Sequence, residues 1–129
     1  MNKRITPKER NLLKGAIRRV FSRSELRRRI IEASVVQHSD PKRKRVKTWC
    51  ICAICGKPEA KSNMQVDHLD PIIPIHLTLE EMSWDTVIDR TWCQENNLQA
   101  VDKNCHKLKT KEEQKTRRRR KNEQRNKAD

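Results

Sequence analysis

The chain has 129 residues, of which 33% are hydrophobic and only 3% aromatic. This composition excludes a large hydrophobic core and favours one small domain with charged arms. No apolar run approaches the roughly 20 residues of a membrane helix, and no apolar segment follows the basic N-terminus, so we expect a cytoplasmic protein with no membrane partner.

The net charge is +14, and the positive charge is concentrated at the two ends of the chain. Residues 1–48 hold 16 Lys/Arg and 4 Asp/Glu, and residues 107–129 hold 11 and 4. Residues 49–106 hold only 4 Lys/Arg against 9 Asp/Glu. Basic ends are typical of a protein that binds a polyanion, and an acidic middle is typical of a segment that binds cations. We therefore expect a nucleic acid as partner.

Residues 1–48 are predicted to form a basic helical arm. Thr6-Pro7-Lys8-Glu9 carries the signals of a helix start, which are a capping box and a proline in the first turn. Ser22-x-x-Glu25 repeats the capping pattern, so the apolar stripe that continues beyond it belongs to two helices or to one bent helix. Ser39-Asp40-Pro41 is expected to break the helix.

Residues 49–113 are predicted to form a small α+β unit, and residues 114–129 a basic tail. We expect strands over residues 49–53, 64–68 and 97–101, with a helix capped by Thr78-x-x-Glu81 and another from about Asn104. The last helix should fray where arginines follow one another, because like charges repel. The candidate nucleic-acid contacts are Lys42, Arg43, Lys44, Arg45, Lys109, Arg117, Arg118, Arg119 and Arg120.

Two further segments carry side chains that suit phosphodiester hydrolysis. One is Val66-Asp67-His68-Leu69-Asp70-Pro71, and the other is Asn97-Leu98-Gln99 followed by Asn104-Cys105-His106-Lys107-Leu108-Lys109-Thr110. This reaction needs an activated water and neutralisation of charge on the phosphate, which a histidine and a divalent cation can supply. In this order the segments resemble the HNH nuclease family over residues 49–113. Small free-standing proteins of bacteriophages are similar, and a phage origin would place the protein in the host cytoplasm.

The resemblance implies a ββα-metal core, in which a two-stranded hairpin and a helix hold one divalent ion such as Mg²⁺. By position, His68 would be the general base and Asn97 would orient it. Asp67 and His106 would be the ligands of the ion. Because adjacent strand residues point to opposite faces, Asp67 and His68 can converge on one site only where the strand ends or is distorted.

A structural zinc site is indicated by Cys52-Ala53-Ile54-Cys55-Gly56-Lys57, because two thiolates at this spacing can share one tetrahedral ion. The resemblance implies a second Cys-x-x-Cys pair, but the sequence there reads Asp102-Lys103-Asn104-Cys105. The fourth ligand is then Asp102, which keeps the spacing and is favoured, or Cys93. Alternatively, no zinc binds and the cysteines are buried. Cys50 is expected to pack inward.

We interpret the sequence as that of a metal-dependent HNH endonuclease that hydrolyses phosphodiester bonds of double-stranded DNA, by nicking or by cutting both strands. One alternative is a non-catalytic, zinc-containing nucleic-acid-binding adaptor with an HNH-like fold, and another is a nuclease directed to RNA. The joint presence of Asp67, His68, Asn97 and His106 argues against the adaptor, since binding alone does not need these side chains together.

Overall fold

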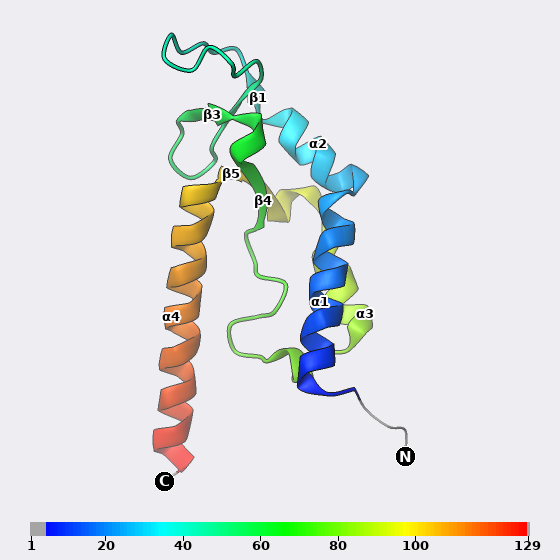
Figure 1. Ribbon diagram of the computed structural model, residues 1–129. Coiled ribbons are helices and arrows are strands. Elements are labelled where there is room, and N and C mark those ends of the chain that lie inside the picture. Colours follow the sequence, from blue (N-terminus) through cyan, green and yellow to red (C-terminus); the bar gives the residue numbers. More distant parts are fainter. Residues whose placement is uncertain (1–4, 129) are drawn as a thin grey trace.

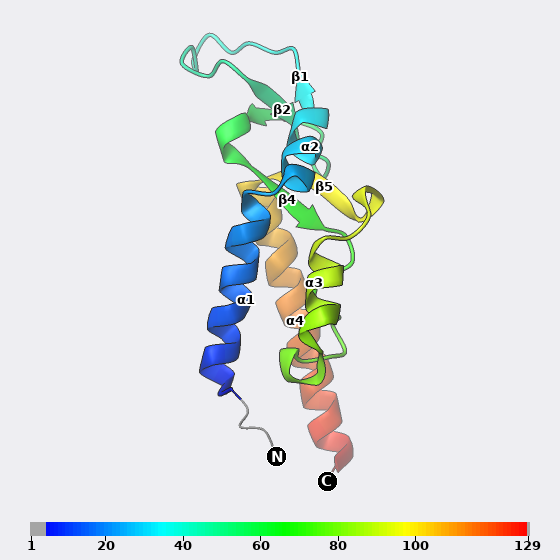
Figure 2. The same ribbon diagram turned by 90° about the vertical axis from the view of Figure 1, so that its right-hand side faces the viewer.

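The computed structural model describes residues 5–128, and its architecture is α+β, with helices around two small antiparallel sheets (Figure 1). The elements in chain order are α1 (Pro7–Ser22), α2 (Glu25–Ala33), β1 (Val35–Val36), β2 (Trp49–Ile51), β3 (Pro58–Ala60), β4 (Met64–His68), α3 (Trp84–Thr91), β5 (Leu98–Asp102) and α4 (Lys103–Ala128). Both views show the sheets near one end of the molecule, with α1 and α4 extending away from them (Figures 1 and 2).

The N-terminal segment forms two helices. The predicted capping box of α1 is confirmed, because the Thr6 hydroxyl accepts from the Glu9 amide at 3.1 Å while the Glu9 carboxylate accepts from the Thr6 amide at 2.9 Å. The predicted cap at Ser22 is wrong. Ser22 is the last residue of α1, and α2 is capped by Ser24, whose hydroxyl accepts from the Arg27 amide. Helix α2 ends at Ala33, before the predicted break.

The first sheet has the order β1-β2-β3 and joins residues on both sides of the predicted boundary at residue 48. Strand β2 is shorter than predicted, because the chain turns at Cys52. The basic run that precedes β2 lies in the loop after β1, where Arg43 forms an ion pair with Glu59 at 2.8 Å and stacks over Trp49.

The second sheet pairs β4 with β5, from Met64 opposite Asp102 to His68 opposite Leu98, and α4 follows β5 directly. The prediction of a strand over residues 64–68 is confirmed. Strand β5 begins and ends one residue later than predicted. Helix α4 continues through the arginine run where fraying was predicted. Arg117 donates hydrogen bonds to the carbonyls of Ile73 and Pro74, which ties this part of the helix to the segment after β4.

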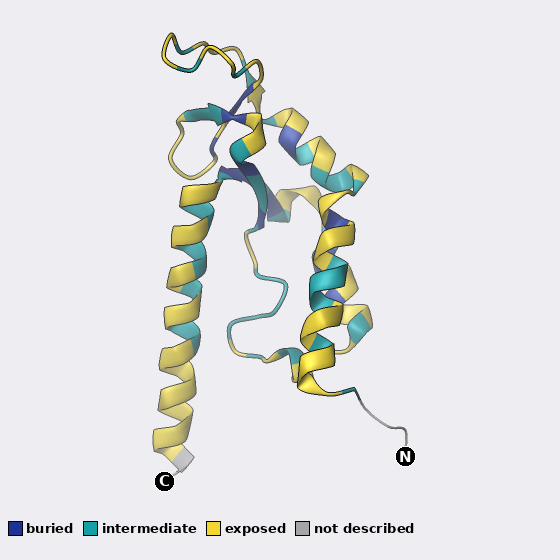
Figure 3. Cartoon of the chain, in the orientation of Figure 1, coloured by how far each residue is buried: buried dark blue, intermediate teal, exposed yellow. Residues whose placement is uncertain are grey.

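One buried cluster joins α2 to both sheets. It contains Ile31 of α2, Cys50 of β2, Met64 of β4 and Ala100 of β5. Cys50 is fully buried, so the prediction that it packs inward is confirmed. Figure 3 shows buried residues gathered around the sheets and largely exposed residues along the distal half of α4. Over residues 5–128, no helix combines the length and apolarity needed to cross a membrane.

Helix α3 lies within the segment that links β4 to β5, and its Arg90 donates to the carbonyls of Pro71 and Ile72. It begins at Trp84 and is capped by Ser83, whose hydroxyl accepts from the Thr86 amide at 3.1 Å. The prediction that Thr78 caps this helix is wrong, because Thr78 precedes only a short 3₁₀ turn. The buried Val87 faces inward, and α3 ends at Thr91 near the end of β4.

Candidate functional site

Asp67, near the end of β4, is a buried carboxylate that faces β5 and α4. Only 7% of the residue is exposed. Gln99, its partner in the β-ladder, donates to Oδ2 at 2.9 Å, and Lys109 Nζ lies 3.0 Å from the same oxygen. A buried carboxylate needs such partners, because it has lost its hydration. The charge of Asp67 is therefore held in place by two donors from neighbouring elements.

His106 lies in the first turn of α4 and faces Asp67, so the structure brings the two predicted ligands of the catalytic ion together. His106 Nε2 is 3.7 Å from Asp67 Oδ1. This separation is too long for a direct hydrogen bond, whose usual limit is about 3.2 Å.

His68, the last residue of β4, is half-buried and points toward α1 and α3. Its Nε2 lies 2.8 Å from the carbonyl oxygen of Thr91, and its ring centroid lies 5.3 Å from that of Phe21. Since a carbonyl oxygen can only accept, Nε2 carries the proton in this contact and Nδ1 keeps its lone pair. Burial lowers the pKa of His68, although the Thr91 carbonyl and Asp67 partly oppose that effect.

Asn97 lies just before β5 and holds the chain that follows His68. Its Oδ1 accepts from the Asp70 amide at 2.8 Å, and its Nδ2 donates to the Asp70 carbonyl at 3.3 Å. Asn97 was expected to orient the imidazole. In the structure it fastens the backbone two residues after His68, while the Thr91 carbonyl contacts the ring.

Lys109, predicted as a nucleic-acid contact, lies within the site. Besides Asp67, its Nζ contacts the His68 carbonyl at 3.1 Å and Glu113 Oε1 at 2.6 Å. Burial alone would lower the pKa of Lys109, but the hydrogen bonds with Glu113 and Asp67 prevail and raise it. Lys109 is thus a charged amine that links β4 to α4.

Three residues that contact Asp67 or His68 were not predicted from the sequence. Gln99 had a usable signal, because a strand paired in register with β4 places it opposite Asp67. Thr91 acts through its backbone carbonyl, which no residue type encodes. Phe21 belongs to a helix outside the motifs, and nothing local in the sequence connects it to His68.

A cavity of about 1050 Å³ opens beside these side chains, between α1, α4 and the segment that follows β4. We call it the α1–α4 cavity. Its lining includes Lys14, Arg18, Asp67, His68, His106 and Arg120. The carboxylate and both imidazoles of the predicted catalytic set therefore border one space that is open to solvent.

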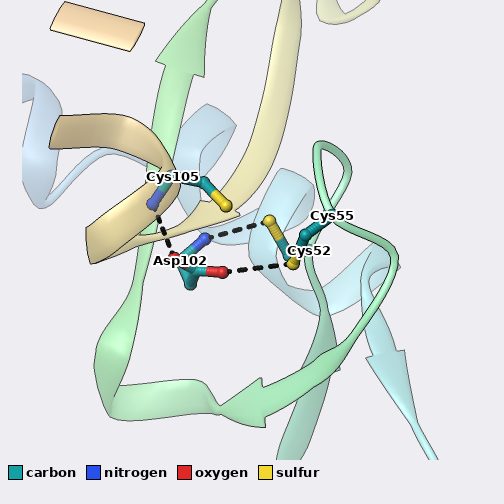
Figure 4. Close-up of side chains that lie close together, drawn as sticks. All are labelled: Cys52, Cys55, Asp102 and Cys105. Carbon is teal, nitrogen blue, oxygen red and sulfur yellow. Dashed lines mark hydrogen bonds between the residues drawn. The ribbon is translucent and has the colours of Figure 1, made fainter. Parts of the chain in front are cut away.

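The four predicted zinc ligands form a second cluster (Figure 4). One ligand atom from each of Cys52, Cys55, Asp102 and Cys105 lies within 4.8 Å of all the others. The two thiols of the turn after β2 face the junction between β5 and α4. Gly56 allows this turn, because its φ of 72° is one that other residues rarely adopt.

The dimensions of this cluster suit a tetrahedral ion. With bonds of about 2.3 Å to sulfur and 2.0 Å to oxygen, neighbouring ligands stand about 3.8 Å apart for two sulfurs and about 3.5 Å for sulfur and oxygen. Cys55 Sγ lies 3.4 Å from Asp102 Oδ2, and no pair exceeds 4.8 Å. The cluster could hold a metal such as zinc after a contraction of about 1 Å.

The electrostatics of the cluster also favour a cation. The Cys105 amide donates to Asp102 Oδ1 at 2.7 Å. This hydrogen bond is the main reason that the pKa of the Asp102 carboxyl group is lowered. Partial burial, with Asp102 and the other two thiols nearby, raises the pKa of Cys105 to about 12. A cation among these ligands would offset the repulsion that disfavours the Cys105 thiolate.

Cys93, the alternative fourth ligand, lies elsewhere. Its Sγ accepts from Asn97 Nδ2 at 3.6 Å, and Cys93 does not belong to the cluster found among residues 5–128. The geometry therefore favours Asp102 over Cys93.

Comparisons of the chain with protein-family models, with curated proteins and with solved structures found no match.

Proposed function

We propose that this chain is a metal-dependent endonuclease of the HNH type that hydrolyses DNA. The observation that carries the proposal is that Asp67, His68 and His106 all line one solvent-open cavity. The antiparallel pairing of β4 with β5, followed directly by α4, supports the proposal, because the HNH resemblance implies a two-stranded hairpin and a helix. The high positive charge of the chain supports a polyanionic substrate.

Asp67 and His106 would hold the catalytic ion. Two ligands of one octahedral Mg²⁺, each about 2.1 Å from it, stand about 3.0 Å apart at right angles and about 4.2 Å apart when opposite. Asp67 Oδ1 and His106 Nε2 are 3.7 Å apart, so a movement of about 0.7 Å would bring them to the separation of two ligands at right angles. When bound, the ion would neutralise charge on the phosphate and on the leaving oxygen.

His68 would act as the general base. Its free Nδ1 can accept a proton from water, while the Nε2 hydrogen stays bonded to the Thr91 carbonyl. That carbonyl holds the ring and also stabilises the imidazolium formed by proton transfer. Because its pKa is lowered, His68 is neutral near pH 7 and ready to accept the proton.

The cysteine cluster would have a structural role in this enzyme. Zinc held by Cys52, Cys55, Asp102 and Cys105 would fasten the turn after β2 to the start of α4. His106 follows Cys105 directly, so the zinc site would fix the position of a ligand of the catalytic ion.

A non-catalytic nucleic-acid adaptor is the second candidate. The observation that favours it is the Lys109 ammonium, which already neutralises the Asp67 carboxylate at 3.0 Å. In an adaptor this ion pair would be permanent, and no divalent ion would be required.

Supercoiled plasmid, linear duplex DNA, single-stranded DNA and RNA, each incubated with the protein in Mg²⁺, in Mn²⁺ or without added divalent ion, test the proposal. We expect DNA cleavage that needs a divalent ion and is lost in His68→Ala. Binding without cleavage under every condition would favour the adaptor, and cleavage of RNA alone would overturn the assignment of DNA as substrate.

A further inference from the structure

The walls of the α1–α4 cavity carry an excess of positive charge. Its cationic side chains are Lys14, Arg18, Arg27, Arg117, Arg120 and Lys121. Within residues 5–128, none of the six forms an ion pair with a carboxylate. Three carboxylates, those of Asp67, Glu81 and Glu113, also line the cavity, and two of them share Lys109.

Five of the six cations lie on α1 and α4, which face each other across the cavity, and the sixth, Arg27, lies on α2. On α1, Lys14 and Arg18 are four residues apart and lie on one face of the helix. On α4, the cavity-facing residues extend from His106 to Gln124, a length of about 27 Å at 1.5 Å per residue. The six cations and the candidate catalytic side chains therefore border the same space.

The positive charges lie close enough to disfavour one another. Lys14 is half-buried, and burial, followed by repulsion from Arg18 and Arg117, lowers its pKa. Arg117 is fixed, because its guanidinium donates to the carbonyls of Ile73, Pro74 and Leu77. An anion in the cavity would offset this repulsion between the cations. Without an anion, the repulsion destabilises the folded chain.

We propose that the α1–α4 cavity binds the phosphate backbone of one nucleic-acid strand and leads it to His68 and Asp67. This inference deepens the proposed function, but the binding it describes does not depend on cleavage. The cavity divides the basic run of α4 into two groups. Arg117, Arg120 and Lys121 line the cavity, whereas Arg118 and Arg119 do not. Helix α1, which lies outside the motifs, becomes the opposite wall of the binding site.

Matched pairs of substitutions test this placement, made in full-length His68→Ala so that the nucleic acid stays intact. Arg120→Gln/Lys121→Gln is compared with Arg118→Gln/Arg119→Gln, which removes the same charge from the same helix. Lys14→Gln/Arg18→Gln is compared with Arg19→Gln/Arg23→Gln, whose arginines are exposed and outside the cavity. Fluorescence anisotropy without chelator or added Mg²⁺ gives the Kd for a labelled duplex and for a single strand over a range of salt concentrations, and circular dichroism checks the fold.

We expect each cavity-facing pair to raise Kd at least tenfold and each control pair to change it no more than about twofold. For duplex DNA the slope of log affinity against log salt should become shallower by about 1.8 when two phosphate contacts are lost. Equal effects in the two members of a comparison would overturn the inference, because binding would then follow net charge alone. A parent chain that binds through this cavity but cuts nothing in Mg²⁺ would instead contradict the nuclease and leave the binding site standing.

Discussion

His68 Nε2 lies 2.8 Å from the carbonyl oxygen of Thr91, so the end of α3 determines which ring nitrogen is free. The contact leaves Nδ1, with its lone pair, as the ring nitrogen that can accept a proton. The nearby Phe21 ring helps to shield the imidazole from water.

The first prediction concerns pH. A general base works when unprotonated, so the cleavage rate should fall as the pH drops through the pKa of His68. Burial lowers that pKa, so the fall should occur below the ordinary histidine value of about 6.5. Phe21→Ala should let water in and shift the fall to higher pH, whereas Leu12→Ala, at an exposed position of α1, should not. An unshifted profile in Phe21→Ala would contradict the shielding role.

The second prediction separates catalysis from binding. His68→Ala should slow single-turnover cleavage about 10²–10⁴-fold, the usual effect of losing a general base, while Kd for DNA changes less than about twofold. His38→Ala is the control, because that imidazole is exposed, lies against Trp49 of β2 and does not line the cavity. Cleavage by His68→Ala within a few-fold of the parent would remove the residue from its role.

The third prediction concerns the catalytic ion. Asp67→Asn and His106→Ala should each raise the Mg²⁺ concentration needed for half-maximal cleavage, because each removes one ligand. Asp89→Asn, at an exposed position of α3, should leave it unchanged. Cleavage measured over a Mg²⁺ titration checks this, and unchanged Mg²⁺ dependence in both site variants would place the ion elsewhere.

The fourth prediction concerns zinc. Elemental analysis should find one zinc per chain, and Cys52→Ser should lose both the zinc and cooperative thermal unfolding. Asp102→Ala should weaken zinc binding more than Cys93→Ser does. Because Asp102 also caps α4, Asp102→Ala should lower stability by a further ~1 kcal/mol. Freshly purified protein without zinc would contradict the assignment.

The fifth prediction concerns Lys109. Lys109→Gln leaves the buried Asp67 carboxylate without its main counter-charge, which should destabilise the fold by about 1–3 kcal/mol without added metal. Mg²⁺ could then replace the lost charge, so it should raise the Tm of Lys109→Gln more than that of the parent. Lys107→Gln, exposed in the same turn of α4, is the control.

Local signals predicted the elements whose stabilising contacts lie close together in the sequence. The cap at Thr6, the strand that ends at His68 and the candidate zinc-ligand spacing depend on a few neighbouring residues. At Ser22 and Thr78 the same capping pattern failed, because Ser24 and Ser83 lie nearer to the actual helix starts. A serine or threonine with an acidic residue three positions later is too short a signal to choose between such neighbours.

Contacts between distant segments could not be predicted in this way. The orientation of His68 depends on a backbone carbonyl 23 residues away, and the persistence of α4 depends on carbonyls that Arg117 reaches about 40 residues back. Which arginines face the cavity depends on where α4 sits against β4 and β5. These properties depend on how distant segments pack together, so no local sequence pattern predicts them.

The buried cluster of Ile31, Cys50, Met64 and Ala100 also constrains how the chain is made. Its members span most of the sequence, and the last of them lies in β5. During synthesis the basic N-terminal helices leave the ribosome long before β5 exists to cover Ile31. The apolar face of α2 therefore stays incompletely covered in the nascent chain until β5 has been synthesised.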